Sequence, residues 1–255
     1  MPETLSLFGI SVILNAQFFF LLLVVFIAGG IRGFTGFGSA LVTVPALTAI
    51  YGPTLAVPIA VLIEVPLSLY LLPVAVRGAE RSTVFPLMVT FLIFVPIGAL
   101  FLKVVDPEIV KILISVLVLF FVGILTLQDR LNLLRSRVGL LAAGIFSGLS
   151  QGMVGMAGPL FVTALLARGE RASQTRANIA AVAGALIAMS VLSLLFFGLI
   201  TIETLVHAVI AVPAVLTGVW AGAWLFDRFS QWNLRWVILV FLTITALVTL
   251  VRALA

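Results

Sequence analysis

The sequence predicts an all-α polytopic membrane protein, built as two inverted repeats of about five hydrophobic segments each. Two observations lead to this fold class. Hydrophobic residues make up 63% of the chain and charged residues only 9%, with a mean hydropathy of +1.36, whereas a soluble domain carries about 25% charged residues. In addition, one glycine-spaced stretch occurs twice, 119 residues apart: GGIRGFTGFGS over 29–39 and GLSQGMVGMAG over 148–158.

Ten apolar segments are predicted between charged and turn-forming residues. Those of the first half lie near 11–31, 38–50, 54–76, 83–102 and 109–127. Those of the second half lie near 138–151, 158–167, 175–197, 203–225 and 234–253. Adding 119 to the positions of the first set lands close to the second set. We therefore expect two transmembrane repeats, 1–127 and 128–255.

Three of the segments, 38–50, 138–151 and 158–167, are short for a membrane crossing. They have 10 to 14 residues, so as helices they reach about 15–21 Å, whereas the hydrocarbon core is roughly 30 Å thick. We therefore expect re-entrant helical hairpins, each broken by its glycine-rich stretch inside the membrane. Irregular backbone is tolerated at that depth only where it is buried in protein or lines a wet cavity.

Basic residues are concentrated in alternate loops. They are Arg77 and Arg81, then Arg130, Arg135 and Arg137, then Arg168 and Arg171, and finally Arg228. By the positive-inside rule, these loops face the cytoplasm and both termini face the periplasm. An odd number of segments per repeat makes the second repeat inverted relative to the first, which is typical of secondary transporters.

Each glycine-rich stretch leads into the start of a helix. Pro159 after Gly158 is typical of a first helical position with Gly158 as N-cap, and the same offset makes Ser39 the N-cap in the first copy. Two helix N-termini would then point their free N–H groups at one spot in the membrane, which favours the binding of an anion. The alternative is that the glycines only permit close helix packing.

Arg32 is the basic residue of the first stretch, and a charge at this depth needs a partner or a cavity. Its guanidinium suits the paired oxygens of a carboxylate, sulfonate or phosphate. Alternatively, it pairs with an acidic residue or reaches the interface. Glu64, inside an apolar run, is either that internal partner or a proton- or cation-coupling group. The position equivalent to Arg32 is Gln151, a neutral donor and acceptor.

We expect the substrate-binding residues to come from both stretches. They are Arg32, Gly33, Thr35, Gly36, Gly38, Ser39, Ser150, Gln151, Gly152, Gly155, Ala157 and Gly158. For the hydroxyl groups of Thr35, Ser39 and Ser150, local capping or turn bonding is the alternative role. Asn178 is expected to form hydrogen bonds across helices.

The same composition argues against several other classes of protein. The chain has no cysteine and a single histidine, His207, so disulfides and thiolate metal sites are excluded and we expect no metal and no cofactor. The basic residues lie in short loops between apolar runs, which is typical of topology signals and not of a nucleic-acid-binding face. An intramembrane enzyme is disfavoured, because no segment carries paired acids or a nucleophile cluster.

The paired Gly-x-x-Gly turns, the Gly-Pro step at 158–159 and the two-half plan resemble the sulfite exporter TauE/SafE family, also called the toluene sulfonate uptake permeases. The resemblance covers essentially the whole chain. It implies transport of small sulfur-containing anions, such as sulfite, sulfoacetate or other sulfonates, in the bacterial inner membrane. Ser39 and Ala157 stand where family motifs usually carry a glycine.

Together, these patterns predict a secondary transporter, favoured as an exporter, of small organic or sulfur oxyanions. The anion would bind at the membrane midplane between the two turns, and the partners would be this anion and the lipid bilayer, with a homodimer left open. Sulfur enters only through the resemblance, because the residues by themselves indicate an anion. A passive anion channel is the main alternative, since the same helix dipoles and Arg32 could line a pore.

Overall fold

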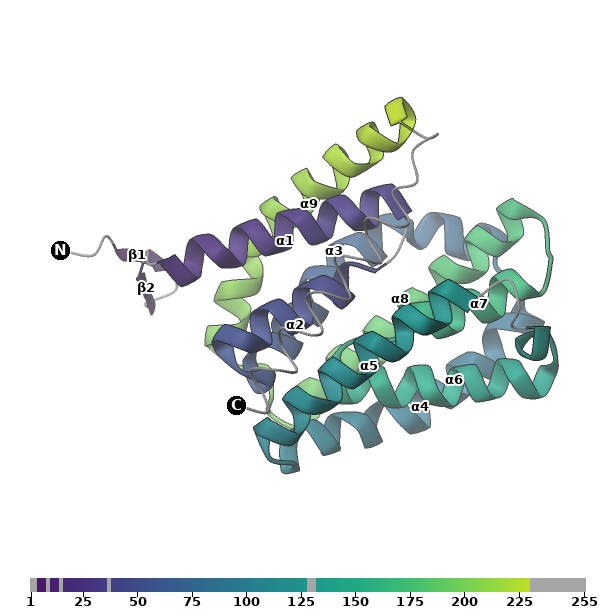
Figure 1. Ribbon diagram of the computed structural model, residues 1–255, viewed down its shortest axis with the longest axis horizontal. Coiled ribbons are helices and arrows are strands. Elements are labelled where there is room, and N and C mark those ends of the chain that lie inside the picture. The colour runs from purple at the N-terminus through teal and green to yellow at the C-terminus, as the bar shows by residue number, and fades with distance from the viewer. Residues whose placement is uncertain (1–3, 8–9, 14–15, 36–37, 128–131, 230–255) are drawn as a thin grey trace.

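The computed structural model describes residues 4–7, 10–13, 16–35, 38–127 and 132–229, and within these ranges the fold is all-α apart from one short strand pair (Figure 1). The helices of the first half are α1 (Ala16–Thr35), α2 (Ser39–Tyr51), α3 (Pro53–Gly78), α4 (Arg81–Val104) and α5 (Pro107–Leu127). Those of the second half are η2 (Asn132–Arg135), α6 (Arg137–Val154), α7 (Gly158–Ala167), α8 (Ala172–Phe196) and α9 (Ile202–Phe229).

Six of these helices are long and apolar enough to cross a membrane: α1, α3, α4, α5, α8 and α9. The chain is therefore a multi-pass membrane protein, as predicted. Helices α2 and α7 have 13 and 10 residues, which confirms two of the three short segments. The tenth predicted segment, 234–253, lies outside the described residues.

Two predicted boundaries are wrong. The first apolar segment does not begin at residue 11, because Thr4–Leu7 (β1) and Ile10–Ile13 (β2) form an antiparallel strand pair and α1 starts at Ala16. The β-branched residues Ile10, Val12 and Ile13 favour an extended backbone. The segment predicted at 138–151 is also too short, since α6 has 18 residues and ends at Val154.

Both glycine-rich stretches are more helical than predicted. Helix α1 continues through Gly29 and Gly33 to Thr35, and α6 continues through Gly152 to Val154. Glycine weakens an isolated helix, but here it lets neighbouring helices approach closely. A Cβ on Gly33 would lie 2.1 Å from the Val219 carbonyl oxygen of α9, and a Cβ on Gly152 would lie 2.1 Å from the Val95 carbonyl oxygen of α4.

These close approaches define two helix pairs, α1 with α9 and α4 with α6. Figure 1 shows the pairs on opposite sides of the molecule, with the other helices between them. Helices α3 and α8 pack against each other, and each also packs against one member of a pair, α3 against α9 and α8 against α4. The short helices α2 and α7 contact α3 and α8, respectively.

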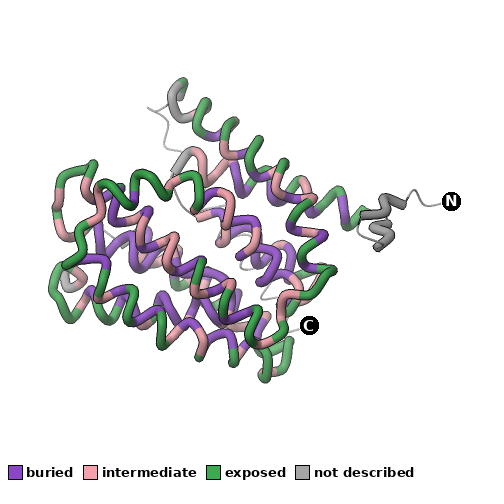
Figure 2. Tube along the Cα trace, turned by 180° about the vertical axis from the view of Figure 1, so that it is seen from behind, coloured by how far each residue is buried: buried purple, intermediate pink, exposed green. Residues whose placement is uncertain are grey.

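The core runs along the inner faces of the helices, and Figure 2 shows buried residues facing inward and exposed residues facing outward. Large apolar side chains are fully buried inside, such as Phe91 and Phe121, but others are exposed on the outside, such as Phe85, Phe196 and Trp220. An exposed apolar surface of this kind marks a contact with lipid and not with water.

Candidate functional site

A cavity of about 70 Å³ lies between the two glycine-rich stretches. A single water needs about 10–15 Å³, so the cavity has room for a small polyatomic ion. Six helices and the connection between α6 and α7 provide its walls. The lining residues are Arg32, Gly38, Ser39, Ala40, Leu41, Glu64, Gln151, Gly155, Met156, Ala157, Gly158, Pro159, Phe161, Val162, Ile179, Ala183, Leu186 and Ile187.

The cavity contains a buried charge pair. The Arg32 guanidinium of α1 contacts the Glu64 carboxylate of α3 through Nη1 and Oε2, and the two side chains are only 14% and 7% exposed. The Ser39 hydroxyl of α2 donates to the other carboxylate oxygen, Oε1. Arg32 also donates to Ser39 Oγ at 3.5 Å. Of the two predicted roles of Glu64, the internal partner of Arg32 is the one that this arrangement displays.

Two helix N-termini open onto the cavity, as the glycine spacing predicts. The first turns of α2 and α7 both belong to its lining. The predicted N-caps are each one residue too late, because Gly38 caps α2 and Ala157 caps α7. Neither makes a side-chain cap bond. Ser39 does not cap its helix, because its hydroxyl is directed to Glu64.

On the second side of the cavity, the backbone turns at Gly155. Its φ of 68° is left-handed, a conformation that glycine adopts without strain. As the C-cap of α6, Gly155 donates its N–H to the Gln151 carbonyl oxygen at 2.8 Å. This turn places Gln151, Ala157 and Gly158 in the lining. On the first side, Gly38 has a φ of 94°.

The predicted binding residues thus fall into three groups. Seven of the twelve line the cavity: Arg32, Gly38, Ser39, Gln151, Gly155, Ala157 and Gly158. Glu64, predicted as a coupling or ion-pair residue, lines it as well. Gly33 and Gly152 lie at helix–helix contacts, and Ser150 donates within α6 to the Phe146 carbonyl at 2.8 Å. Gly36 and the side chain of Thr35 lie outside the described part of the chain.

The cavity also has a wall that the sequence did not single out. Met156, Phe161, Ile179, Leu186 and Ile187 are apolar lining residues. In a chain that is 63% hydrophobic, no local pattern separates them from residues that face lipid or core. A small ion with one polar end and one apolar part would find both kinds of surface here, since the charge pair and the helix N-termini belong to the same lining.

Several lining residues are related by the 119-residue offset. Five such pairs occur: Arg32 with Gln151, Gly38 with Ala157, Ser39 with Gly158, Ala40 with Pro159 and Glu64 with Ala183. Five positions of the first half and their counterparts at this offset therefore line the same cavity.

Comparison with protein families decides the assignment. The sequence profile described as "Sulfite exporter TauE/SafE" matches residues 21–249, which is most of the chain. The chain belongs to the TauE/SafE family. It is therefore a multi-pass membrane protein of a transporter family. No curated protein and no solved structure matches the chain.

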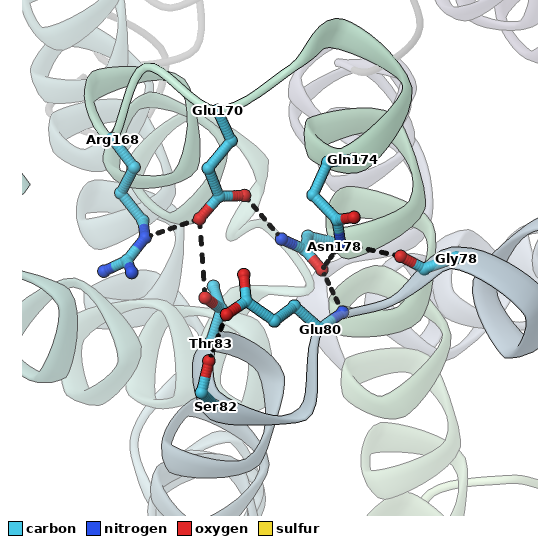
Figure 3. Close-up of polar contacts among 8 residues, drawn as sticks. All are labelled: Gly78, Glu80, Ser82, Thr83, Arg168, Glu170, Gln174 and Asn178. Atoms are coloured by element: carbon cyan, nitrogen blue, oxygen red, sulfur yellow. Dashed lines mark hydrogen bonds and ion pairs between the residues drawn. The ribbon is translucent and has the colours of Figure 1, made fainter.

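This TauE/SafE protein has a second polar cluster, which joins the connection between α3 and α4 to the start of α8 (Figure 3). The Glu170 carboxylate accepts from Arg168 Nε at 2.8 Å and from Asn178 Nδ2 at 2.7 Å. Asn178 Oδ1 in turn accepts the Glu80 N–H at 2.7 Å, and Gln174 donates to the Gly78 carbonyl at 2.6 Å. Asn178 thus bonds beyond its own helix, as predicted, but its partners Glu80 and Glu170 lie in the connections between helices and not within another helix.

Proposed function

We propose that this protein is a secondary transporter that exports small sulfur-containing anions, such as sulfoacetate, other sulfonates or sulfite. The observation that carries the proposal is the cavity itself, where one arginine and the N-terminal turns of α2 and α7 meet. Family membership supports the sulfur chemistry. Negative charge on the substrate follows from the arginine and from the helix dipoles.

Each polar group of the cavity has a role in this proposal. Arg32 binds two oxygens of the anion with its planar fork, at a contact of roughly 1.5–3 kcal/mol. The free N–H groups at the starts of α2 and α7 bind further oxygens, and Gln151 adds one neutral contact. The apolar wall around Phe161 and Leu186 would hold the carbon part of a sulfonate.

The direction of transport follows from the membrane potential. An inside-negative membrane favours the exit of an anion by about 2.3 kcal/mol per charge per 100 mV. Export of a bare anion therefore needs no second driving ion, whereas import would. We propose export on this ground.

We further propose that 1–127 and 128–255 are inverted repeats, with the binding site near the membrane midplane at their interface. Two observations support this. The counterpart of α1 in the second half is α6, and the counterpart of α4 is α9. Replacing each helix by its counterpart therefore turns the packed pair α1–α9 into the packed pair α6–α4. The cavity is also lined by residues that are 119 positions apart, such as Glu64 and Ala183.

The substrate class is tested by binding to the purified protein. We expect sulfoacetate, sulfite and thiosulfate to bind more tightly than acetate in isothermal titration calorimetry, because they present three oxygens or a larger anionic group to the arginine and the helix ends. If acetate binds as tightly as sulfoacetate, the sulfur specificity is wrong. Flux of labelled sulfoacetate into proteoliposomes should saturate and should accelerate when unlabelled substrate is inside. Flux that neither saturates nor exchanges would indicate a channel instead.

The orientation is tested with two exposed positions at opposite ends of the helices. Because the chain has no cysteine, single variants label without background. Ser173, at the start of α8, and Glu203, at the start of α9, are both exposed. By the positive-inside rule, an impermeant maleimide added to the periplasmic side of intact cells should label the Glu203→Cys variant and not the Ser173→Cys variant. The reverse labelling would overturn the topology.

A further inference from the structure

We propose that anion binding at Arg32 is coupled to protonation of Glu64, so that one proton is taken up for each anion bound. This inference rests on the proposed function, because it adds a protonation step to anion binding at the same site. The membrane-potential argument above applies to a bare anion; a monovalent anion that crosses together with this proton carries no net charge, so the concentration gradients of anion and proton would set its direction. It starts from the observation that the cavity's cation is already occupied by an internal carboxylate.

The charges of the protein groups around the cavity balance one another. The Arg32 guanidinium contacts one oxygen of Glu64, and the Ser39 hydroxyl donates to the other. Both carboxylate oxygens therefore have a donor, which is how a buried carboxylate retains its charge. The pair has no net charge, so neither group is an isolated ion inside the membrane.

An anion changes this balance. To contact Arg32 it must share the guanidinium with Glu64, and two negative groups then face one cation in a buried site. That excess charge is unfavourable in a medium of low polarity. Uptake of a proton by a Glu64 carboxylate oxygen removes this excess negative charge. The proton comes from solution, and the Arg32 guanidinium stays protonated. No covalent bond of the anion is made or broken. The Ser39 hydroxyl, a donor to the ionised carboxylate, can then accept from the protonated carboxyl.

No other described charge near the cavity can take the place of Glu64. Among the described lining residues, the remaining side chains from α2, α6, α7 and α8 are uncharged. Apart from Glu64, the described charged side chains of the long helices α3, α4, α5, α8 and α9 lie toward the helix ends. None of them lines the cavity: Arg77, Arg81, Lys103, Glu108, Lys111, Arg176, Glu203 and Arg228. His207 is the single histidine of the chain. It lies near the start of α9, where its ring contacts Tyr51, and it serves as the control below.

The decisive measurement uses the wild-type protein and methanesulfonate, an anion that stays fully ionised across the tested pH range and so carries no proton itself. Calorimetric titrations at one pH in Tris, triethanolamine and imidazole avoid buffers with sulfonate or phosphate groups. The observed binding enthalpy is plotted against the ionisation enthalpy of each buffer. The slope of this plot gives the number of protons exchanged, and we expect uptake of about one proton per anion. Because the bound state carries the extra proton, Kd should rise with pH, by up to about tenfold per pH unit.

A pair of variants assigns the proton. Glu64→Gln, which mimics the neutral carboxyl, should bind methanesulfonate without proton uptake and with an affinity independent of pH. His207→Gln removes the single histidine of the chain and should behave as the wild type. If Glu64→Gln does not fold, Glu64→Asp keeps a carboxylate and should retain the proton uptake.

The outcomes separate this inference from the function on which it rests. Methanesulfonate binding with no proton uptake by the wild type, or uptake that persists in Glu64→Gln, would overturn the inference and leave the anion site intact. Uptake lost in His207→Gln would also overturn it. Failure of methanesulfonate, sulfoacetate and sulfite to bind at any pH from about 5 to 9 would refute the proposed function itself.

Discussion

The first glycine-rich stretch brings Arg32 and Ser39 to the cavity, whereas the second brings Gln151 and Gly158 to the equivalent positions. The carboxylate of Glu64 likewise has Ala183 as its counterpart. Both sides therefore provide a glycine-shaped turn and a helix start, but only one side provides charge. A second arginine would place two like charges in one small buried cavity, and with Ala183 in place of an acid it would lack a partner. The two stretches thus provide similar backbone turns, and in the proposed function the charge that meets the substrate comes from the first stretch alone.

Arg32 provides the strongest test of this difference. Arg32→Gln should weaken anion binding about tenfold to a hundredfold, because a charge-assisted hydrogen bond contributes about 1.5–3 kcal/mol. Arg32→Lys keeps the charge but loses the planar fork, so its affinity for the anion should lie between those of the wild type and Arg32→Gln. Calorimetry with sulfoacetate measures both. An Arg32→Gln protein that is folded and binds with wild-type affinity would reduce Arg32 to a structural partner of Glu64.

Gly152 tests whether a predicted site residue acts through helix packing. Its added Cβ would lie 2.1 Å from the Val95 carbonyl oxygen, so Gly152→Ala should push α6 away from α4 and destabilise the protein by about 1–3 kcal/mol. The affinity of the folded fraction should not change. Gly184→Ala is the matched control, because nothing lies within 4 Å of a Cβ at that position.

Thermal unfolding in detergent measures the effect at Gly152. A normal melting temperature combined with a clear loss of anion affinity would instead return Gly152 to the binding site.

Gln151 should give the smallest effect. As the neutral counterpart of Arg32, its amide offers an uncharged hydrogen bond of about 0.5–1.5 kcal/mol. Gln151→Leu should therefore weaken sulfoacetate binding only about two- to tenfold. A loss as large as that of Arg32→Gln would mean that the two sides of the cavity contribute equally, which contradicts the comparison above.

The two polar regions differ in a similar way. Around Glu170 and Asn178, hydrogen bonds join one connection to another across the ends of the helices, and none of these residues lines the main cavity. Arg32, Ser39 and Glu64 form an equally connected group, but theirs opens onto space for a ligand. Burial and bonding alone therefore do not mark the site. The hollow beside the second cluster is lined mostly by apolar residues such as Val84, Phe85 and Met88, whereas the proposed binding cavity is lined by Arg32 and two helix N-termini.

Composition alone was enough to place this chain in the membrane, because a sequence with so few charges cannot cover a water-facing surface. The repeat and the short helices α2 and α7 were also readable, since segment length and glycine spacing are local properties. Glycine spacing could not separate binding from packing, however. The same intervals suit a turn and a close helix contact, and only the positions of α4 and α9 showed that Gly33 and Gly152 lie at helix contacts.

The partners of the polar side chains depended on tertiary structure for a different reason. Arg32 and Glu64 are 32 positions apart, and Asn178 meets a backbone group 98 positions away. Whether such groups pair, reach the membrane surface or face a ligand is decided by which helix faces lie side by side, not by the residues next to them in the chain. The apolar wall around Phe161 shows the same limit, because in a chain this hydrophobic only the packing of helices distinguishes a cavity from lipid.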